Sequence, residues 1–231
     1  MAETSPVKVR TAGALRSGTS LCAEKFRSEF NRTFAASFTH GPHIEVELAN
    51  GACDADIVGL MDDAIAGAIA TGLLGTRRVS VGSIQIGIAM RETAERPDLL
   101  SLDTFVASLK AADALIYTTA ASGEYMQGVF EHLGLAAMVA PKAVRFASGN
   151  EVNQRLMAGT QRRELAFGVA TEFLANPRVV YLGPLPKEIQ NPSPYEFAAL
   201  KGRADDQRVQ QVLDFFDTAE ARRIFASTGV D

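Results

Sequence analysis

Strand-like and helix-like segments alternate along the whole chain, and this alternation constrains its fold more than any other feature. Residues 7–11 (VKVRT) alternate apolar and polar side chains, which is typical of a strand. The next apolar residues, Leu15, Cys22, Phe26 and Phe30, are mostly four apart, which is typical of one helix face. Because the two patterns keep returning, the sequence predicts an α/β fold.

The remaining predicted elements alternate between strands and helices in the same way. Further strands are predicted at 34–39, 55–60, 79–90, 114–118, 143–146, 165–170, 179–182 and 195–200. Further helices are predicted at 42–50, 62–74, 103–112, 122–133, 149–157, 205–216 and 219–228, with Asp103 as a candidate N-cap.

The predicted elements form two similar halves, which meet near residues 80–90 and again near 185–200. We therefore expect a discontinuous first lobe (1–82 and 195–231) and a second lobe (83–194), and the 231 residues are enough for two such lobes. Two lobes joined by more than one crossover leave a cleft between them, where small ligands usually bind.

Composition and charge exclude several classes of protein. The 23 Lys and Arg residues against 27 Asp and Glu residues give a net charge of −4, so nucleic-acid binding is not expected. No apolar run approaches the roughly 18 residues of a membrane span. The opening MAETSPVKVR lacks the basic and apolar regions of a signal peptide. This predicts either a cytoplasmic protein or the mature form of an exported, periplasmic one with an added Met.

Motifs for cofactors, metals and nucleophilic catalysis are absent from the sequence. It contains no P-loop, no G-x-G-x-x-G after a strand and no G-x-S-x-G elbow, so no cofactor is predicted. His40 and His43 are three apart but have no nearby third ligand, so no metal site is predicted. Cys22 and Cys53 are expected to be ordinary free thiols.

Short turns of small and hydroxyl residues follow four predicted strands and open the next helix. They are TAGALR (11–16), THGP (39–42), TTAASG (118–123) and ASGN (147–150). Helix N-termini bind anions through free N–H groups and the helix dipole, and glycine lets the backbone approach a ligand. One such turn is usually a simple helix cap, but with two from each half a shared binding site becomes an equal alternative to simple capping.

These turns supply most of the candidate ligand-binding residues. In the first half they are Thr11, Gly13, Ala14, Arg16, Thr39, His40 and Gly41, and in the second half Thr119, Ala121, Ser122, Gly123 and Asn150. His40 has a side chain that either donates to a carboxylate or moves a proton. Arg16 either reaches the ligand or points into solvent from the first turn of its helix.

A series of loose motifs in one order carries a family resemblance over nearly the whole chain. They are VKVRTAGALR, FTHG, CDADIVGL, ASGEYMQGVFEHLGL, GNEVNQRLMAG, LAFGVATEF, VVYLGPLP and DFFDTAEARRIFASTGV. Together they resemble the type II periplasmic binding-protein fold, in its molybdate-binding-protein-like branch. The resemblance implies two lobes, a hinge of two or three strands, and an anionic ligand held between facing helix N-termini.

The resemblance also marks where this chain departs from molybdate receptors. Ala14 and His40 stand where those receptors have hydroxyl residues, and Thr171 stands where they have a tyrosine, which adds Thr171 to the candidate ligand-binding residues. Losing hydroxyl donors leaves a small oxyanion with too few partners. His40, with Arg16 nearby in sequence, suits a larger organic carboxylate.

Two main functions follow from the resemblance. The first is a solute-binding protein that clamps a small oxyanion or carboxylate for an ABC-type transporter, whose membrane subunit is the expected partner. The second is an isomerase of an unsaturated di- or tricarboxylate, because the same branch includes aconitate isomerase. In that case His40 or Glu124 is the base and the helix N-termini hold the developing charge. A metabolite sensor is a third alternative.

Overall fold

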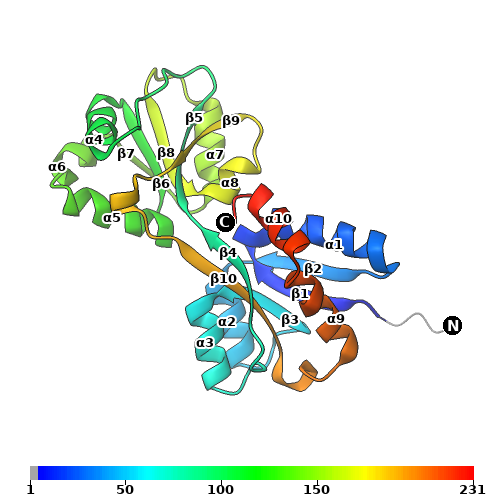
Figure 1. The fold of residues 1–231 in the computed structure, drawn as a ribbon. Coiled ribbons are helices and arrows are strands. Elements are labelled where there is room, and N and C mark those ends of the chain that lie inside the picture. Colours follow the sequence, from blue (N-terminus) through cyan, green and yellow to red (C-terminus); the bar gives the residue numbers. More distant parts are fainter. Residues whose placement is uncertain (1–4) are drawn as a thin grey trace. The chain divides into compact units, whose positions relative to one another are not determined.

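The computed structural model describes residues 5–231, which form two compact units (Figure 1). Unit 1 contains the chain up to Ile84 together with Ser193–Asp231, and unit 2 contains Gln85–Pro192. Each unit is built on its own five-stranded mixed sheet. The α/β type II periplasmic binding-protein fold predicted from the sequence is confirmed.

The sheet of unit 1 has the strand order β2-β1-β3-β10-β4. Strands β1 (Val7–Ala12), β2 (Phe34–Thr39) and β3 (Ile57–Met61) are parallel, whereas β10 (Ser193–Ala199) is antiparallel to β3 and to β4 (Val79–Ile84). Its helices are α1 (Arg16–Phe30), α2 (Gly41–Ala49), α3 (Asp62–Ala70), α9 (Gln207–Phe216) and α10 (Ala219–Ser227), with 3-10 turns at Gly13–Leu15 and Lys201–Arg203.

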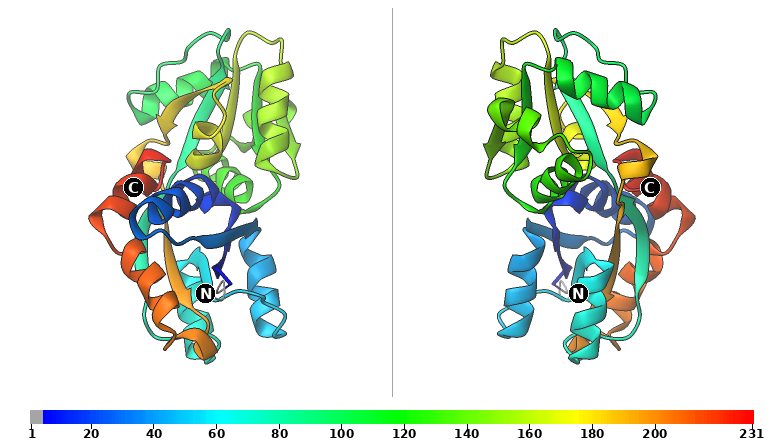
Figure 2. Two further views of the ribbon diagram at one scale, coloured as in Figure 1. Left: turned by 90° about the vertical axis from the view of Figure 1, so that its right-hand side faces the viewer. Right: turned by 90° about the vertical axis from the view of Figure 1, so that its left-hand side faces the viewer.

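Helices α1, α9 and α10 cover one face of this sheet, and α10 lies beside α1 (Figures 1 and 2). Aromatic side chains fill this layer: the Phe197 and Phe216 rings stack at 4.3 Å between centroids, and Phe26, Phe34 and Phe225 surround them. Each buried Phe contributes about 1.5–3 kcal/mol. These rings therefore fix the C-terminal helices on the strands that carry the first two turns.

The sheet of unit 2 has the strand order β7-β6-β8-β5-β9. Strands β6 (Ala114–Thr118), β7 (Ala143–Phe146) and β8 (Glu164–Val169) are parallel, whereas β5 (Ile86–Arg91) is antiparallel to β8 and to β9 (Val179–Pro184). Its helices are α4 (Leu102–Ala111), α5 (Ala121–His132), α6 (Ala136–Val139), α7 (Gly149–Ala158) and α8 (Ala170–Leu174), with 3-10 turns at Ala140–Lys142 and Lys187–Ile189.

Unit 2 has a separate apolar layer on each face of its sheet. Phe105, Phe130 and Phe167 meet edge to face on the side of α4 and α5. Leu156 and Phe173 belong to the layer of α7 and α8 on the other side. Both layers pack against β8, so they fix the helices that begin at the carboxyl ends of β6, β7 and β8.

Two local predictions are wrong. The segment 79–90 is not one strand, because β4 pairs in the sheet of unit 1 and β5 in that of unit 2, with a break at Gln85. Apolar side chains alternate straight through the break, at Ile84 and Ile86, and so hide the change of sheet. The N-cap of α4 is Ser101 rather than Asp103, in a reciprocal capping box with Thr104.

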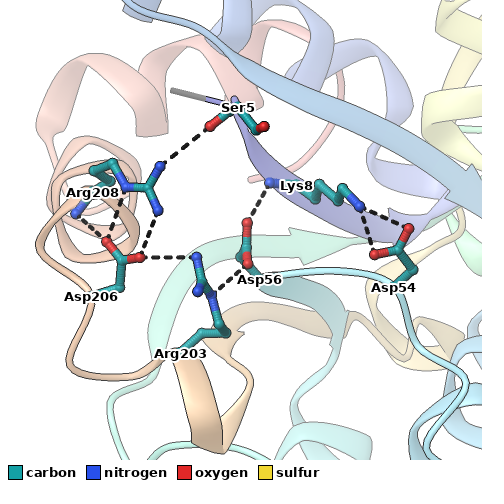
Figure 3. A network of polar contacts seen from close by, with 7 residues as sticks. All are labelled: Ser5, Lys8, Asp54, Asp56, Arg203, Asp206 and Arg208. Carbon is teal, nitrogen blue, oxygen red and sulfur yellow. Dashed lines mark hydrogen bonds and ion pairs between the residues drawn. The ribbon is translucent and has the colours of Figure 1, made fainter. Parts of the chain in front are cut away.

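An ion-pair network closes the amino edge of the sheet in unit 1 (Figure 3). The Asp56 carboxylate accepts from the Lys8 backbone N–H at 2.8 Å and pairs with Arg203 at 2.7 Å. Asp206, the N-cap of α9, pairs with Arg203 and Arg208. Hydrogen bonds from Arg208 lower the pKa of Asp206 to about 2. The network therefore ties α9 to β1 and β3 at the edge opposite the turns predicted to bind ligand.

Candidate functional site

The carboxyl edge of the sheet in unit 1 carries two of the predicted turns, one after β1 and one after β2. The Thr11 side chain is fully buried, and its hydroxyl donates to the Gly59 carbonyl at 3.0 Å. A Cβ on Gly13 would lie 3.8 Å from the Thr39 carbonyl oxygen. Thr11 thus has a structural partner, and the parallel pairing of β1 with β2 brings the Gly13 and Thr39 turns together.

Arg16 lies at the start of α1, beside the second turn. Its side chain is exposed, and its guanidinium carbon lies 4.4 Å from the centroid of the Phe38 ring. An exposed cation–π contact of this kind contributes about 0.5–1 kcal/mol. The contact holds a positive charge at the carboxyl ends of β1 and β2, and Phe38 is a contributor that the sequence patterns did not indicate.

His40 is the N-cap residue of α2, and its imidazole is exposed. Its carbonyl accepts from the N–H of His43, while Gly41 and the N–H-free Pro42 fill the first turn. The His43 Nε2 atom lies 3.1 Å from the Glu47 carboxylate, one helical turn on. Within residues 5–231 no group of three or more His, Cys, Asp or Glu side chains is placed to hold a metal ion.

In unit 2 the turn between β6 and α5 is tightly built. The Thr119 N–H donates to the Phe146 carbonyl at 2.7 Å, and the Ser122 hydroxyl lies 3.2 Å from that of Thr118. Ala121 is the first residue of α5 and is exposed. A Cβ on Gly123 would collide with the backbone of Thr118. Glycine is therefore required there for α5 to begin directly over the end of β6.

The turn before α7 differs from the others. The Ser148 hydroxyl and the Glu151 carboxylate form a reciprocal capping box, and exposed Asn150 lies in the first turn. A Cβ on Gly149 would collide with the carboxylate of Glu172. The N-terminus of α7 thus has partners of its own, which the S-x-x-E pattern at 148–151 indicates in the sequence. Glu172 carried no such signal.

Two further predicted residues lie at the same edge of unit 2. Thr171 belongs to the short helix α8, is 4% exposed, and has a hydroxyl without a hydrogen-bond partner in the described part of the chain. Glu124 lies in the first turn of α5 with its side chain exposed. One predicted residue is thus buried at this edge and the other faces solvent.

The helix ends divide into two classes. In the structure of residues 5–231 no side chain caps the turn at Gly13–Leu15 or the starts of α1, α2, α3, α5, α6 and α8. By contrast, side chains of Ser101, Ser148, Asp206 and Thr218 cap α4, α7, α9 and α10. First-turn N–H groups have no partner within a helix, so the uncapped ends are free to bind water or an anion.

Two surface pockets lie elsewhere in the units. One, of about 370 Å³, lies beside α4 and is lined by residues that include Arg96, Ser108 and Arg163. The other, of about 420 Å³, is lined by Arg77, Ala204 and their neighbours. Neither contains a residue predicted to bind ligand, and both lie near the amino edges of the parallel strands.

The family comparison agrees with this geometry. The model of the bacterial extracellular solute-binding protein family matches residues 7–231. The chain belongs to this family. The match includes both units and all four turns.

Individual relatives of this solute-binding protein are more distant. Aconitate isomerase from a Pseudomonas species is 25% identical over 178 residues, which are 76% of this chain and 67% of the isomerase. The periplasmic molybdate-binding protein of Azotobacter vinelandii has the same fold (TM-score 0.75, 15% identity, covering 97% of this chain and 98% of that one). So does Peb3 of Campylobacter jejuni in its L-phospholactate-bound form (TM-score 0.67, 16% identity, covering 96% and 98%).

The thiols of this solute-binding protein lie outside the candidate site. Cys22 and Cys53 are both free, as expected. Burial, reinforced by the charge of Glu220, raises the pKa of Cys22 to about 12, so its thiol stays protonated. None of the helices among residues 5–231 has the length and apolar character needed to cross a membrane.

Proposed function

We propose that this protein binds a small organic carboxylate without changing it and delivers it to an ABC-type transporter. The observation that carries the proposal is the set of helix N-termini without side-chain caps, at Gly13–Leu15, α2 and α5. These ends all follow parallel strands at the carboxyl edges of their sheets, where ligands of open α/β sheets bind. An anion bound at such an end would accept from the first-turn N–H groups to which no side chain of the protein is bonded.

Arg16 and His40 favour an organic acid over a tetrahedral oxyanion. The Arg16 guanidinium, stacked over Phe38, presents the paired donors that match a carboxylate. Ala14 offers no hydroxyl in the same turn, so a small oxyanion would lack a donor there. Peb3, which has the same fold, has been crystallised with L-phospholactate, an organic anion, and this supports the proposed ligand class.

The proposed partner is the membrane subunit of a transporter, and the proposed location is the periplasm. Both follow from the family, whose members are extracellular solute-binding proteins. A receptor of this kind must be exported in order to meet its ligand and its transporter.

A thermal-shift panel tests the proposal. Molybdate, tungstate and sulfate are compared with acetate, succinate, malate, citrate and tricarballylate. A ligand present at a hundredfold excess over its Kd stabilises the folded protein by about 2.7 kcal/mol, which is a clear rise in Tm. We expect di- or tricarboxylates to raise the Tm and to remain chemically unchanged on prolonged incubation.

A large shift with molybdate or tungstate and none with the carboxylates would contradict the proposed ligand class. No shift with any anion would contradict anion binding as a whole. Arg16→Gln supplies the internal check, because it removes the guanidinium and leaves α1 intact. Arg27→Gln, near the other end of the same helix, is the matched control.

The isomerase remains a second candidate because a relative at 25% identity is an aconitate isomerase. Moving a double bond beside a carboxylate requires a base that removes a proton from carbon and returns it to another carbon. His40 and Glu124 are exposed at the two edges and are the candidates for that role. Incubation with cis- or trans-aconitate, followed by proton NMR, tests it. Conversion that is lost in His40→Ala or Glu124→Gln would favour the enzyme.

A further inference from the structure

The pocket beside α4 is a concave site that the proposed function does not use. It lies entirely within unit 2, between α4, the connection from β5 to α4 (residues 92–101) and the start of β8 (Figure 1). Its volume is about 370 Å³. Small-molecule sites in proteins are typically roughly 300–1,000 Å³ in volume, so this pocket is large enough for a small ligand.

One wall of the pocket is a face of α4 that carries only small side chains. Four residues three or four apart in the helix line the pocket: Thr104, Ala107, Ser108 and Ala111. Between them in the sequence, Phe105 and Leu109 are fully buried in the core of unit 2. Leu165 of β8 also lines the pocket and is 4% exposed. Because the lining side chains of α4 are small, this wall leaves a mainly apolar groove.

The connection before α4 forms a second wall, which is tied to the protein at both ends. The Glu95 backbone N–H donates to the Arg162 carbonyl at 3.0 Å, and the Glu95 carboxylate accepts from the Arg163 Nε at 3.1 Å. At the other end, the Ser108 hydroxyl of α4 donates to the Asp98 carbonyl at 2.8 Å. The pocket is therefore formed by hydrogen bonds of the protein itself, before any ligand binds.

Two opposite charges that line the pocket have no ionic partner in the described part of the chain. Glu95 is paired with two arginines, which leaves Arg96 and Asp98. The exposed Arg96 guanidinium has no hydrogen bond or ion pair within residues 5–231. The Asp98 Oδ1 atom accepts from the Leu100 N–H at 3.0 Å, whereas Oδ2 has no partner in the same residues. The groove thus has a cation and an anion, two residues apart, available to a ligand.

We propose that this pocket binds a small apolar amino acid in its zwitterionic form. The ligand carboxylate bonds to the Arg96 guanidinium, and the ligand ammonium group bonds to the Asp98 Oδ2 atom. The apolar side chain of the ligand lies along the face of α4 that carries Ala107 and Ala111. Both charges of the ligand and both charges of the protein then have a partner. This site belongs to unit 2 alone and uses no residue of the proposed carboxylate site.

Three molecules with the same branched carbon chain test the charge requirement. Leucine carries both charges, isocaproate lacks the ammonium group, and isoamylamine lacks the carboxylate. Proton–nitrogen correlation NMR spectra of the whole chain, recorded during titration, give both the Kd and the residues affected. An exposed ion pair contributes at most about fivefold in affinity, so leucine should bind up to about fivefold more tightly than either analogue. The shifted amides should lie in residues 95–112.

Arg96→Gln and Asp98→Asn each remove one of the two charges. We expect Arg96→Gln to weaken leucine binding by up to about fivefold and to leave isoamylamine binding unchanged. Asp98→Asn should weaken leucine binding to a similar extent and leave isocaproate binding unchanged. Ala111→Leu fills the groove from an exposed helix position and should weaken the binding of all three molecules. Arg162→Gln, which removes an exposed arginine outside the lining, is the matched control.

Equal binding of leucine, isocaproate and isoamylamine would overturn the inference. So would leucine-induced shifts that lie outside residues 95–112, or no binding of leucine. An unchanged leucine affinity in both Arg96→Gln and Asp98→Asn, with wild-type circular dichroism, would also overturn it. None of these outcomes bears on the proposed function, which is tested with other ligands and with Arg16→Gln.

Discussion

The carboxyl edges of the two sheets are built alike but differ in charge. In unit 1 the edge presents Arg16, stacked on Phe38, and the imidazole of His40, together with Asp62 and Asp63 in the first turn of α3. In unit 2 it presents Glu124 and Glu172. Both edges offer helix N-termini, so the side chains rather than the backbone distinguish them. A net charge of −4 does not prevent anion binding, because a guanidinium and helix N-termini attract an anion locally.

The largest expected difference between the two edges is the stability cost of replacing a turn glycine by alanine. Gly13→Ala introduces only an ordinary contact with the Thr39 carbonyl, whereas Gly123→Ala drives a Cβ into the backbone of Thr118. We expect Gly123→Ala to lower the free energy of unfolding by about 3 kcal/mol, and Gly13→Ala to change it by less than about 1 kcal/mol. Urea denaturation measures both.

Gly128→Ala is the control for the helix that carries Gly123. Its Cβ would meet nothing within 4 Å, so this substitution should stabilise α5 by up to about 1 kcal/mol. Equal costs for Gly13→Ala and Gly123→Ala would show that the two turns are not constrained differently.

The next largest effect is that of the Arg16 charge in unit 1 on ligand affinity. Arg16→Gln removes the guanidinium that faces the turn after β2, and we expect the affinity for a dicarboxylate to fall about tenfold. Phe38→Leu keeps the charge but removes the aromatic face, so its effect should be smaller and of the same sign. Titration calorimetry measures both, with Arg27→Gln as the control. An unchanged affinity in Arg16→Gln would place Arg16 outside the site.

The ion-pair network at the amino edge of unit 1 is expected to affect the stability of the protein but not its affinity for a ligand. Asp206→Ala removes the N-cap of α9 and its ion pairs, and should lower the free energy of unfolding by about 1 kcal/mol at pH 7. Anion affinity should not change, because the network lies at the edge opposite the turns. Asp205→Ala, its exposed neighbour, is the control. A loss of affinity in Asp206→Ala would show that the two edges of the sheet are coupled.

The same variant has a defined pH dependence. The pKa of Asp206 falls from its ordinary value of 3.8 to about 2 in the folded protein, so its carboxylate stabilises the fold above pH 4. That contribution is lost as the pH falls towards 2. The difference in stability between wild type and Asp206→Ala should therefore narrow between pH 4 and pH 2 in urea titrations. A difference that stays constant over this range would contradict the ion-pair explanation.

Structural features that depend on residues close together in the chain could be predicted from the sequence. Hydrophobic periodicity predicts the order of strands and helices, and small residues after the strands predict the turns. The capping box at Ser148 and Glu151 could also have been predicted, since a serine three residues before a glutamate is its signature, but we did not predict it from the sequence.

The sequence did not predict the contacts that depend on tertiary packing. Arg16 meets Phe38 only because β1 pairs with β2, and Glu172 reaches Gly149 only because α7 packs beside α8. The break at Gln85 had no signal because the alternation of apolar residues continues through it. These features depend on residues far apart in the chain, which no local pattern specifies.

The smallest expected effect separates the two acidic side chains of unit 2. Glu124 is exposed in the first turn of α5, where its charge is screened by solvent, whereas Glu172 is fixed against Gly149. An exposed charge of this kind contributes at most about 1 kcal/mol, so Glu124→Gln should tighten anion binding by no more than about fivefold, and by the same factor for every acid. Calorimetry with succinate and malate measures this. A change that differs between succinate and malate would contradict this explanation by solvent screening.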